Sequence, residues 1–233
     1  MKRLVEYLLA CMGTATVATL AVFYLKRGNV AAGYAAIMVL VLIVAWRARL
    51  PIFLYQSLVL LGVAAFRISM TNLQDLRNAV APDARLVFST VAAILLLLAG
   101  VVLAFPLRAP RSETDARQKW ITFLIDHPEQ PMFFVPVILM GVFLWIEMKE
   151  RLALGWAVEG VVIFILALIA KERSFRLTGL GLLMVCFAMT IWGLLRPGTS
   201  TTTRYLTLMG LGVIFLVVSF LYGRLRETIR EYL

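Results

Sequence analysis

Charged residues, cysteine and histidine are all scarce in this sequence. Only 15% of its 233 residues are charged, whereas soluble domains carry about a quarter. The two cysteines, Cys11 and Cys186, lie inside apolar stretches and form no CxxC pair, so no disulfide framework is predicted. The single histidine, His127, excludes a bis-histidine haem within one chain and a His-rich metal site.

Short catalytic and cofactor motifs are also missing. The sequence contains no P-loop, GxSxG, HExxH or dinucleotide fingerprint. Its ten methionines are scattered, which does not favour a copper path, because soft-ligand sites need clustered sulfurs. The net charge of +10 does not come from a basic stripe interleaved with aromatic residues, so nucleic-acid binding is not predicted. We expect no cofactor other than bound lipids.

Long apolar runs are what the sequence has in abundance. Hydrophobic residues make up 62% of the chain, and its mean hydropathy is +0.91. A bilayer-spanning helix needs about 20 predominantly apolar residues. Eight such runs are present, and they predict an all-α integral membrane protein with eight transmembrane helices: Leu4–Leu25, Val30–Trp46, Pro51–Met70, Leu86–Phe105, Met132–Met148, Leu152–Ala170, Leu177–Leu195 and Tyr205–Tyr222.

The basic residues between these runs predict the orientation. Fourteen of the 23 lysines and arginines lie on the side that holds both termini, and nine lie on the other side. Lysine and arginine are enriched in cytoplasmic loops. We therefore expect the bacterial cytoplasmic (inner) membrane, with both termini in the cytoplasm.

Two connecting segments are long enough to have structure of their own. Thr71–Arg85 is rich in polar residues and is predicted to be a loop on the outer side. Within 107–131, a capping-box pattern precedes apolar residues at helical spacing. That spacing predicts a short interfacial helix, which rests on the lipid surface or packs on a partner through Trp120, Phe123 and Leu124.

An internal duplication is the next feature. Trp46-Arg-Ala-Arg-Leu50 follows the second run much as Ala170-Lys-Glu-Arg-Ser174 follows the sixth, and Gly33-Tyr34 corresponds to Gly155-Trp156. This pattern predicts two tandem four-span units, 1–110 and 131–233, joined by the linker 107–131. Because four is even, both units enter the membrane from the same side, which gives a parallel repeat.

The second half also resembles a known family. The residues that carry the resemblance lie in the last three runs: Trp156, Glu159, Gly160, Arg176, Gly179, Arg204, Gly210, Gly212, Ser219 and Tyr222. In these features the C-terminal half is similar to the DUF2339 family of predicted bacterial polytopic membrane proteins, whose function is unknown. That family tends to have a lysine late in the seventh span, where this chain has Met189.

Three charged residues are candidates for function. Glu159 lies about 10 Å into its predicted span, and an ionisable group at that depth suggests a functional site. The alternative is a structural hydrogen bond or ion pair near the headgroups. Arg67 sits near a span end, where snorkelling to the interface would also explain it. Arg176 enters the seventh span.

These observations leave three functions open. The first is a non-catalytic accessory or scaffolding subunit of a larger membrane complex, with lipids and other membrane subunits as partners. The second is a small transporter or channel that uses Glu159 as its coupling site. The third is an enzyme acting on lipid or glycan, for which Asp75, Asp83 and Glu150 are the only acids predicted on the outer side. The sequence favours the first and a role that is not enzymatic.

Overall fold

The computed structural model is helical throughout the part of the chain that it describes. This part comprises residues 2–79, 83–107, 126–148, 152–170 and 172–195, with separate positions between 205 and 223. The helices form two compact units, Met1–Ile146 and Glu147–Leu233. The unit boundary therefore groups a fifth long helix with the first four, whereas the predicted tandem units divide at 110 and 131. Compactness does not test a repeat, and the duplication stays a prediction.

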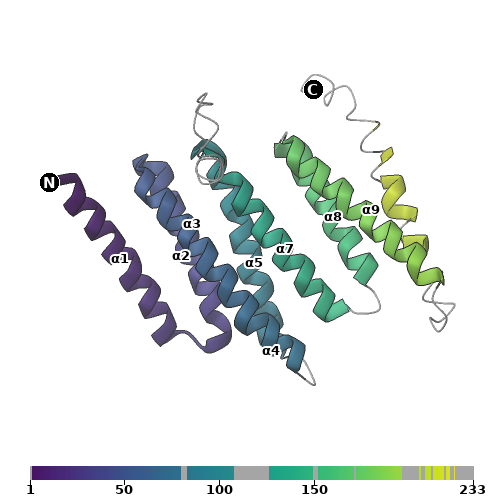
Figure 1. The fold of residues 1–233 in the computed structure, drawn as a ribbon, viewed down its shortest axis with the longest axis horizontal. Helices are drawn as coiled ribbons and strands as arrows, with labels where there is room; N and C mark the ends of the chain where they lie inside the picture. Colours follow the sequence, from purple (N-terminus) through teal and green to yellow (C-terminus); the bar gives the residue numbers. More distant parts are fainter. Residues whose placement is uncertain are drawn as a thin grey trace, which may run out of the picture. The chain divides into compact units, whose positions relative to one another are not determined.

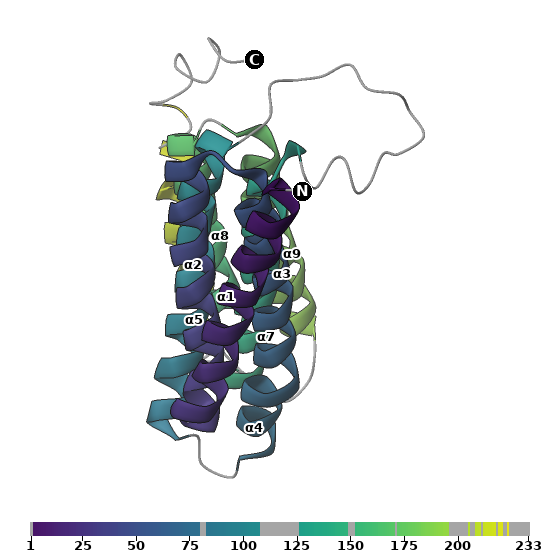
Figure 2. The ribbon, with the colours of Figure 1, turned by 90° about the vertical axis from the view of Figure 1, so that its left-hand side faces the viewer.

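The first unit contains most of the helices. In chain order these are α1 (Lys2–Tyr24), the 3₁₀ turn η1 (Arg27–Asn29), α2 (Val30–Ala48), α3 (Pro51–Arg67), the π segment η2 (Ile68–Asn72), α4 (Leu73–Asn78), α5 (Ala84–Ala104), the 3₁₀ turn η3 (Phe105–Leu107) and α7 (Glu129–Met148). Figure 1 shows α3 and α7 in front of α2 and α5, and Figure 2 shows the same two layers from the side.

The core of this unit lies around α2, which packs against both α3 and α5. Met38 and Leu42 of α2 are completely buried. A Cβ atom added to Gly100 of α5 would lie 2.8 Å from Cε of Met38 and 3.6 Å from Sδ of Met132. The glycine thus makes room for two methionines, one from α2 and one from α7.

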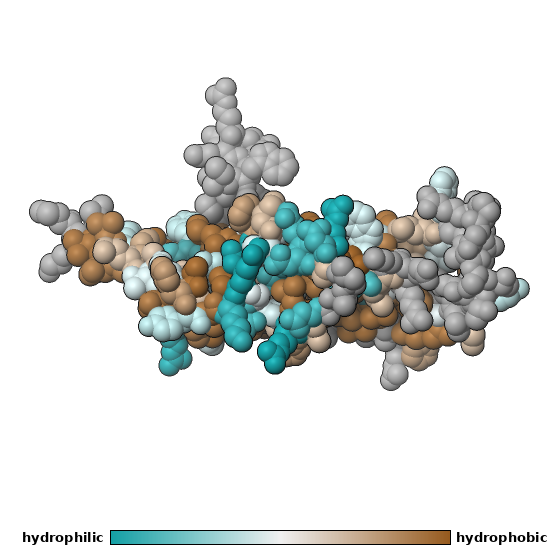
Figure 3. All heavy atoms as spheres, turned by 90° about the horizontal axis from the view of Figure 1, so that it is seen from below, coloured by the Kyte–Doolittle hydropathy of each residue, from teal (hydrophilic) through white to brown (hydrophobic). Residues whose placement is uncertain are grey.

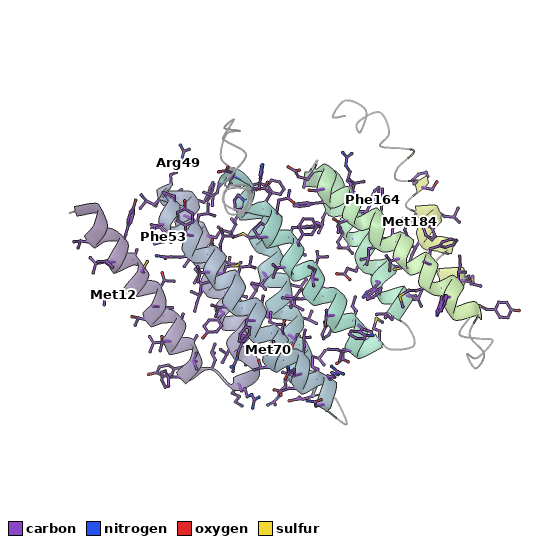
Figure 4. The ribbon with its side chains drawn as sticks, in the orientation of Figure 1. Met12, Arg49, Phe53, Met70, Phe164 and Met184 are labelled. Atoms are coloured by element: carbon purple, nitrogen blue, oxygen red, sulfur yellow. The ribbon has the colours of Figure 1, made fainter. Side chains whose placement is uncertain are left out.

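Local sequence explains where these helices begin and end. The Arg49 N–H makes the last hydrogen bond of α2, to the Ala45 carbonyl. The helix ends at Arg49 because its φ of 53° lies in the left-handed region. Pro51 then starts α3, because a proline has no N–H to leave unpaired in a first turn. At α5, the Asp83 side chain accepts a hydrogen bond from the Arg85 N–H at 3.0 Å and caps the helix. Figure 4 labels Arg49 at its end of α2.

The predicted loop Thr71–Arg85 is wrong in its first part. Residues 71–78 continue the α3 helix through η2 and α4. The polar composition suggested a loop, but Leu73 and Leu76 are buried and hold the segment against the unit. The helical stretch Pro51–Asn78 is therefore longer than the predicted span.

The second unit is built on a helical hairpin. α8 (Leu152–Ala170) and α9 (Arg173–Leu195) pack against each other along their lengths. α8 has the bounds that the sequence predicts, whereas α9 begins four residues before the predicted Leu177. Arg176 therefore lies in the first turn of a helix rather than in the connecting turn.

Six helical stretches of the described residues are long and apolar enough to cross a membrane. Two more apolar helices, Leu152–Ala167 and Leu208–Val217, are shorter. The view in Figure 3 shows hydrophilic side chains and apolar side chains on the same face. The all-helical fold and its apolar helices are compatible with a multi-pass membrane protein, as the sequence predicts.

Candidate functional site

Glu159 is the most unusual side chain of the second unit. It lies on α8 and is only 9% exposed. Both of its carboxylate oxygens are buried, and neither has a hydrogen-bond partner among the described residues. Burying a carboxylate without hydrogen bonds or a counter-charge is costly, so such groups persist mainly where they are used.

Two glycines bring α8 and α9 unusually close beside Glu159. A Cβ atom on Gly179 would lie 2.9 Å from the backbone nitrogen of Phe164 and 3.0 Å from the carbonyl oxygen of Gly160. Small residues at helix crossings allow this approach in membranes. Phe164, labelled in Figure 4, is 1% exposed and belongs to the hairpin core together with Ala157, Leu183 and Cys186.

Cys186 is the described polar neighbour of Glu159 on α9. Cys186 is completely buried in the hairpin core. One turn further on, the Thr190 hydroxyl donates to the Cys186 carbonyl at 2.8 Å, so it is occupied within its own helix. Among the described residues, neither a cation nor a hydrogen-bond donor reaches the carboxylate.

Arg176 does not pair with Glu159. It lies half-buried in the first turn of α9, and its N–H donates to the Glu172 carbonyl at 3.3 Å. It comes three residues before Gly179, which contacts the α8 backbone. The structure therefore brings two of the predicted residues onto one hairpin without joining their charges.

Arg67 lies at the junction of α3 with the π segment η2. It ends α3, its side chain is half-buried, and its Nε atom is buried without a hydrogen-bond partner among the described residues. Its carbonyl accepts a hydrogen bond from the Thr71 hydroxyl, so it leads directly into the π segment η2. Short π segments inside helices are frequent at functional sites.

The interfacial helix was predicted to contact the lipid surface or a partner through three apolar residues. Trp120, Phe123 and Leu124 lie outside the described residues.

The structure adds a buried polar cluster that sequence reasoning missed. The carbonyl oxygen of Gly28 in η1 accepts hydrogen bonds from Asn72 Nδ2 at 3.1 Å and from Ser89 Oγ at 2.7 Å. Asn72 Nδ2 also donates to Thr90 Oγ1 at 3.1 Å. Three separate segments, η1, η2 and α5, are thereby tied together. The only signal in the sequence was a polar residue at the end of one apolar run and two hydroxyl residues near the start of another.

We expect Asn72→Ala to lower the free energy of unfolding of the first unit by about 1–3 kcal/mol. The substitution leaves the Gly28 carbonyl with one donor fewer and removes a hydrogen bond from Thr90, and unmade buried hydrogen bonds cost this amount. Thermal unfolding in detergent measures the effect. Asn78→Ala, at the exposed end of α4, is the control and should change the midpoint little. Equal midpoints for the two variants would contradict the structural role of Asn72.

A second polar link ties α1 to α3. The Thr14 hydroxyl donates to Oε1 of Gln56 at 2.7 Å, and Nε2 of Gln56 donates to the Cys11 sulfur at 3.3 Å. Side-chain hydrogen bonds between helices hold membrane bundles together. Gln56 is thus a polar anchor for a helix that otherwise makes little contact with its unit.

No candidate metal site is present among the described residues. No three side chains of the types His, Cys, Asp and Glu lie close enough together there to hold an ion. His127 Nδ1 lies 3.2 Å from Oε1 of Glu129 at the start of α7, and the Glu129 side chain is fully buried.

Comparisons with family models, curated proteins and solved structures found no match. The resemblance of the second half to the DUF2339 family therefore stays a prediction.

Proposed function

We propose that this chain is an accessory or scaffolding subunit of a larger complex in the bacterial inner membrane, without catalytic activity of its own. In this proposal it has eight spans, both termini lie in the cytoplasm, and its partners are lipids and other membrane subunits.

The observation that carries the proposal is the exposure of α1. In the stretch Tyr7–Tyr24 no residue is buried, whereas 28–44% of the residues are buried in the apolar windows of the other five candidate spans. Met12, labelled in Figure 4, is 66% exposed. A span with so little of its surface buried in its own unit has that surface available to a neighbour.

The composition of this surface favours a helix as that neighbour. The exposed residues of α1 include several small ones: Gly13, Ala15, Thr16 and Thr19. Thr16 and Thr19 donate to carbonyls of their own helix at 2.8 Å, so their hydroxyls need no outside partner. Small residues let a second helix approach closely and gain van der Waals contact, which lipid chains fill less specifically.

The test is extraction from native membranes in mild detergent, followed by native electrophoresis and mass spectrometry. We expect a stoichiometric complex that Gly13→Leu disrupts. Gly62→Leu on α3 is the matched control, because both glycines are exposed and a Cβ atom on either meets nothing within 4 Å. Migration of the wild-type chain alone or as a small homo-oligomer would overturn the proposal, as would equal complex formation by both variants.

A second candidate function rests on Glu159. A carboxylate whose two buried oxygens have no hydrogen-bond partner among the described residues supports a small transporter or channel in which this group accepts a proton or a cation during transport. This candidate predicts an ion flux in proteoliposomes that Glu159→Gln abolishes.

A further inference from the structure

A groove of about 620 Å³ lies in the first unit, between the end of α1, the start of α2 and the start of α5. Its walls are mainly apolar and include Leu25, Ala32, Gly33, Phe88 and Ala92. Asn29, Arg85 and Ser89 add polar groups to its lining. The volume is within the range of small-molecule sites, which is roughly 300–1,000 Å³.

Small side chains make this groove. Ala32, Gly33, Ala84 and Ala92 leave space that larger residues would fill. A Cβ atom on Gly33 would collide with Cδ1 of Leu25. Leu25, the residue that follows α1, therefore packs against α2 at one side of the groove. Phe88, which is 75% exposed, adds a bulky apolar side chain to the lining. The hollow is thus a consequence of helix packing.

The groove has the length of a lipid chain rather than of a spanning helix. On α5 its lining runs from Ala84 to Ala92, which is about 12 Å at 1.5 Å per residue. One leaflet contributes about half of the roughly 30 Å hydrocarbon core. An acyl chain of one leaflet matches this length, whereas a transmembrane helix would extend well beyond it.

Charge at the end of the groove favours an anionic headgroup. Arg85 is exposed in the first turn of α5, and the neighbouring turn between α1 and α2 carries Lys26 and Arg27. Two acids oppose them. Asp83 accepts from the Arg85 N–H, and Asp75 lies 3.6 Å from Arg27. That ion pair is largely exposed and therefore weak, and the local balance remains basic.

We propose that this groove binds an anionic glycerophospholipid, with one acyl chain along α5 and the phosphate on the Arg85 guanidinium. Apolar surface alone cannot select this ligand, because the surrounding lipid tails are as apolar as the groove. Selection comes from the shape of the hollow and from the charge-assisted hydrogen bonds that an arginine makes to a phosphate. The inference is independent of whether the chain is a subunit or a transporter.

The experiment is native mass spectrometry of the purified full chain. Phosphatidylglycerol and phosphatidylcholine with identical acyl chains are added separately, and the lipid retained after activation in the gas phase is measured. We expect one phosphatidylglycerol per chain to be retained and phosphatidylcholine to be lost. Arg85→Gln should reduce retention about tenfold, and Ala92→Phe should reduce it similarly by filling the hollow.

Each variant has a matched control. Arg77→Gln removes an exposed arginine of α4 that does not line the groove. Ala99→Phe places the same ring on the same face of α5, two turns further on, at an exposed residue outside the groove. Both controls should retain lipid as the wild type does. Arg85 is exposed, so its variant tests the proposal even where Ala92→Phe impairs folding.

Three results would overturn the inference. The first is equal retention of the two lipids by the wild-type chain. The second is unchanged retention in Arg85→Gln. The third is equal retention of phosphatidylglycerol by Ala92→Phe and Ala99→Phe, which would place the bound lipid outside the groove.

Discussion

Replacing Gly179 by valine is expected to separate α8 from α9 and to produce the largest loss of stability among the substitutions considered for the second unit. A Cβ atom at this position would lie 2.9 Å from the Phe164 nitrogen and 3.1 Å from the Phe164 Cα. Both are backbone atoms, and they cannot swing aside as a side chain can. Over-packing usually costs about 1–3 kcal/mol, and an immobile neighbour makes about 3 kcal/mol or more the expectation here.

Gly181→Val provides the matched control. It changes the same residue type on the same helix two positions away, and a Cβ atom there meets nothing within 4 Å. Its effect should stay within the few tenths of a kcal/mol by which valine and glycine differ in helix propensity. The midpoint of thermal unfolding in detergent, detected as the loss of the monodisperse species, is measured for both variants. If Gly179→Val and Gly181→Val unfold at the same temperature, the close crossing of the two helices is not what stabilises the hairpin.

The positions of the apolar helices were the part of the fold that sequence reasoning could predict well. Seven of the eight predicted runs have a described helix at the corresponding place, and α8 has the predicted bounds. The physical reason is that the apolar core of a bilayer sets the length of a spanning segment and requires its backbone hydrogen bonds to be satisfied within a helix. The eighth run is described only at separate positions, and the total of eight spans stays a prediction.

Polar residues near span ends were harder to interpret. Asn72 was assigned to a loop, yet it is 1% exposed and lies in a helical segment. Its side chain is satisfied by Gly28, which is 44 residues away. The composition of a short window of sequence cannot reveal such a partner, because Gly28 lies in the turn between α1 and α2, far from Asn72 in the sequence. The same limit applies to the groove, which depends on how small residues of α2 and α5 come to face a common space.

Glu159 was partly predictable. Its position in an apolar run identified it as a candidate, but the sequence could not show whether a neighbouring helix would supply a donor. The nearest small residues of α9 instead bring backbone and apolar atoms against α8. The absence of a partner for either oxygen among the described residues favours the functional hypothesis over a structural hydrogen bond.

The second large effect concerns this carboxylate and has the opposite sign. Glu159→Met is expected to raise the free energy of unfolding by about 1–3 kcal/mol, because it replaces an unsatisfied buried polar group by an apolar one of similar length. Glu159→Gln keeps a polar group in the same place and should change stability much less. Glu147→Met near the end of α7, where the side chain is half-buried, is the control and should stay within about 0.5 kcal/mol of the wild type.

Stability and activity together decide what the carboxylate does. Functional sites often trade stability for activity, so a stabilised Glu159→Met variant that has lost its complex or its ion flux would identify Glu159 as the functional group. The Glu159→Gln variant then separates the two candidate functions. Loss of flux from an intact chain supports transport, and loss of a partner supports assembly. A Glu159→Met variant that is less stable than the wild type would show that the carboxylate has a stabilising partner, and both functional hypotheses for it would then fail.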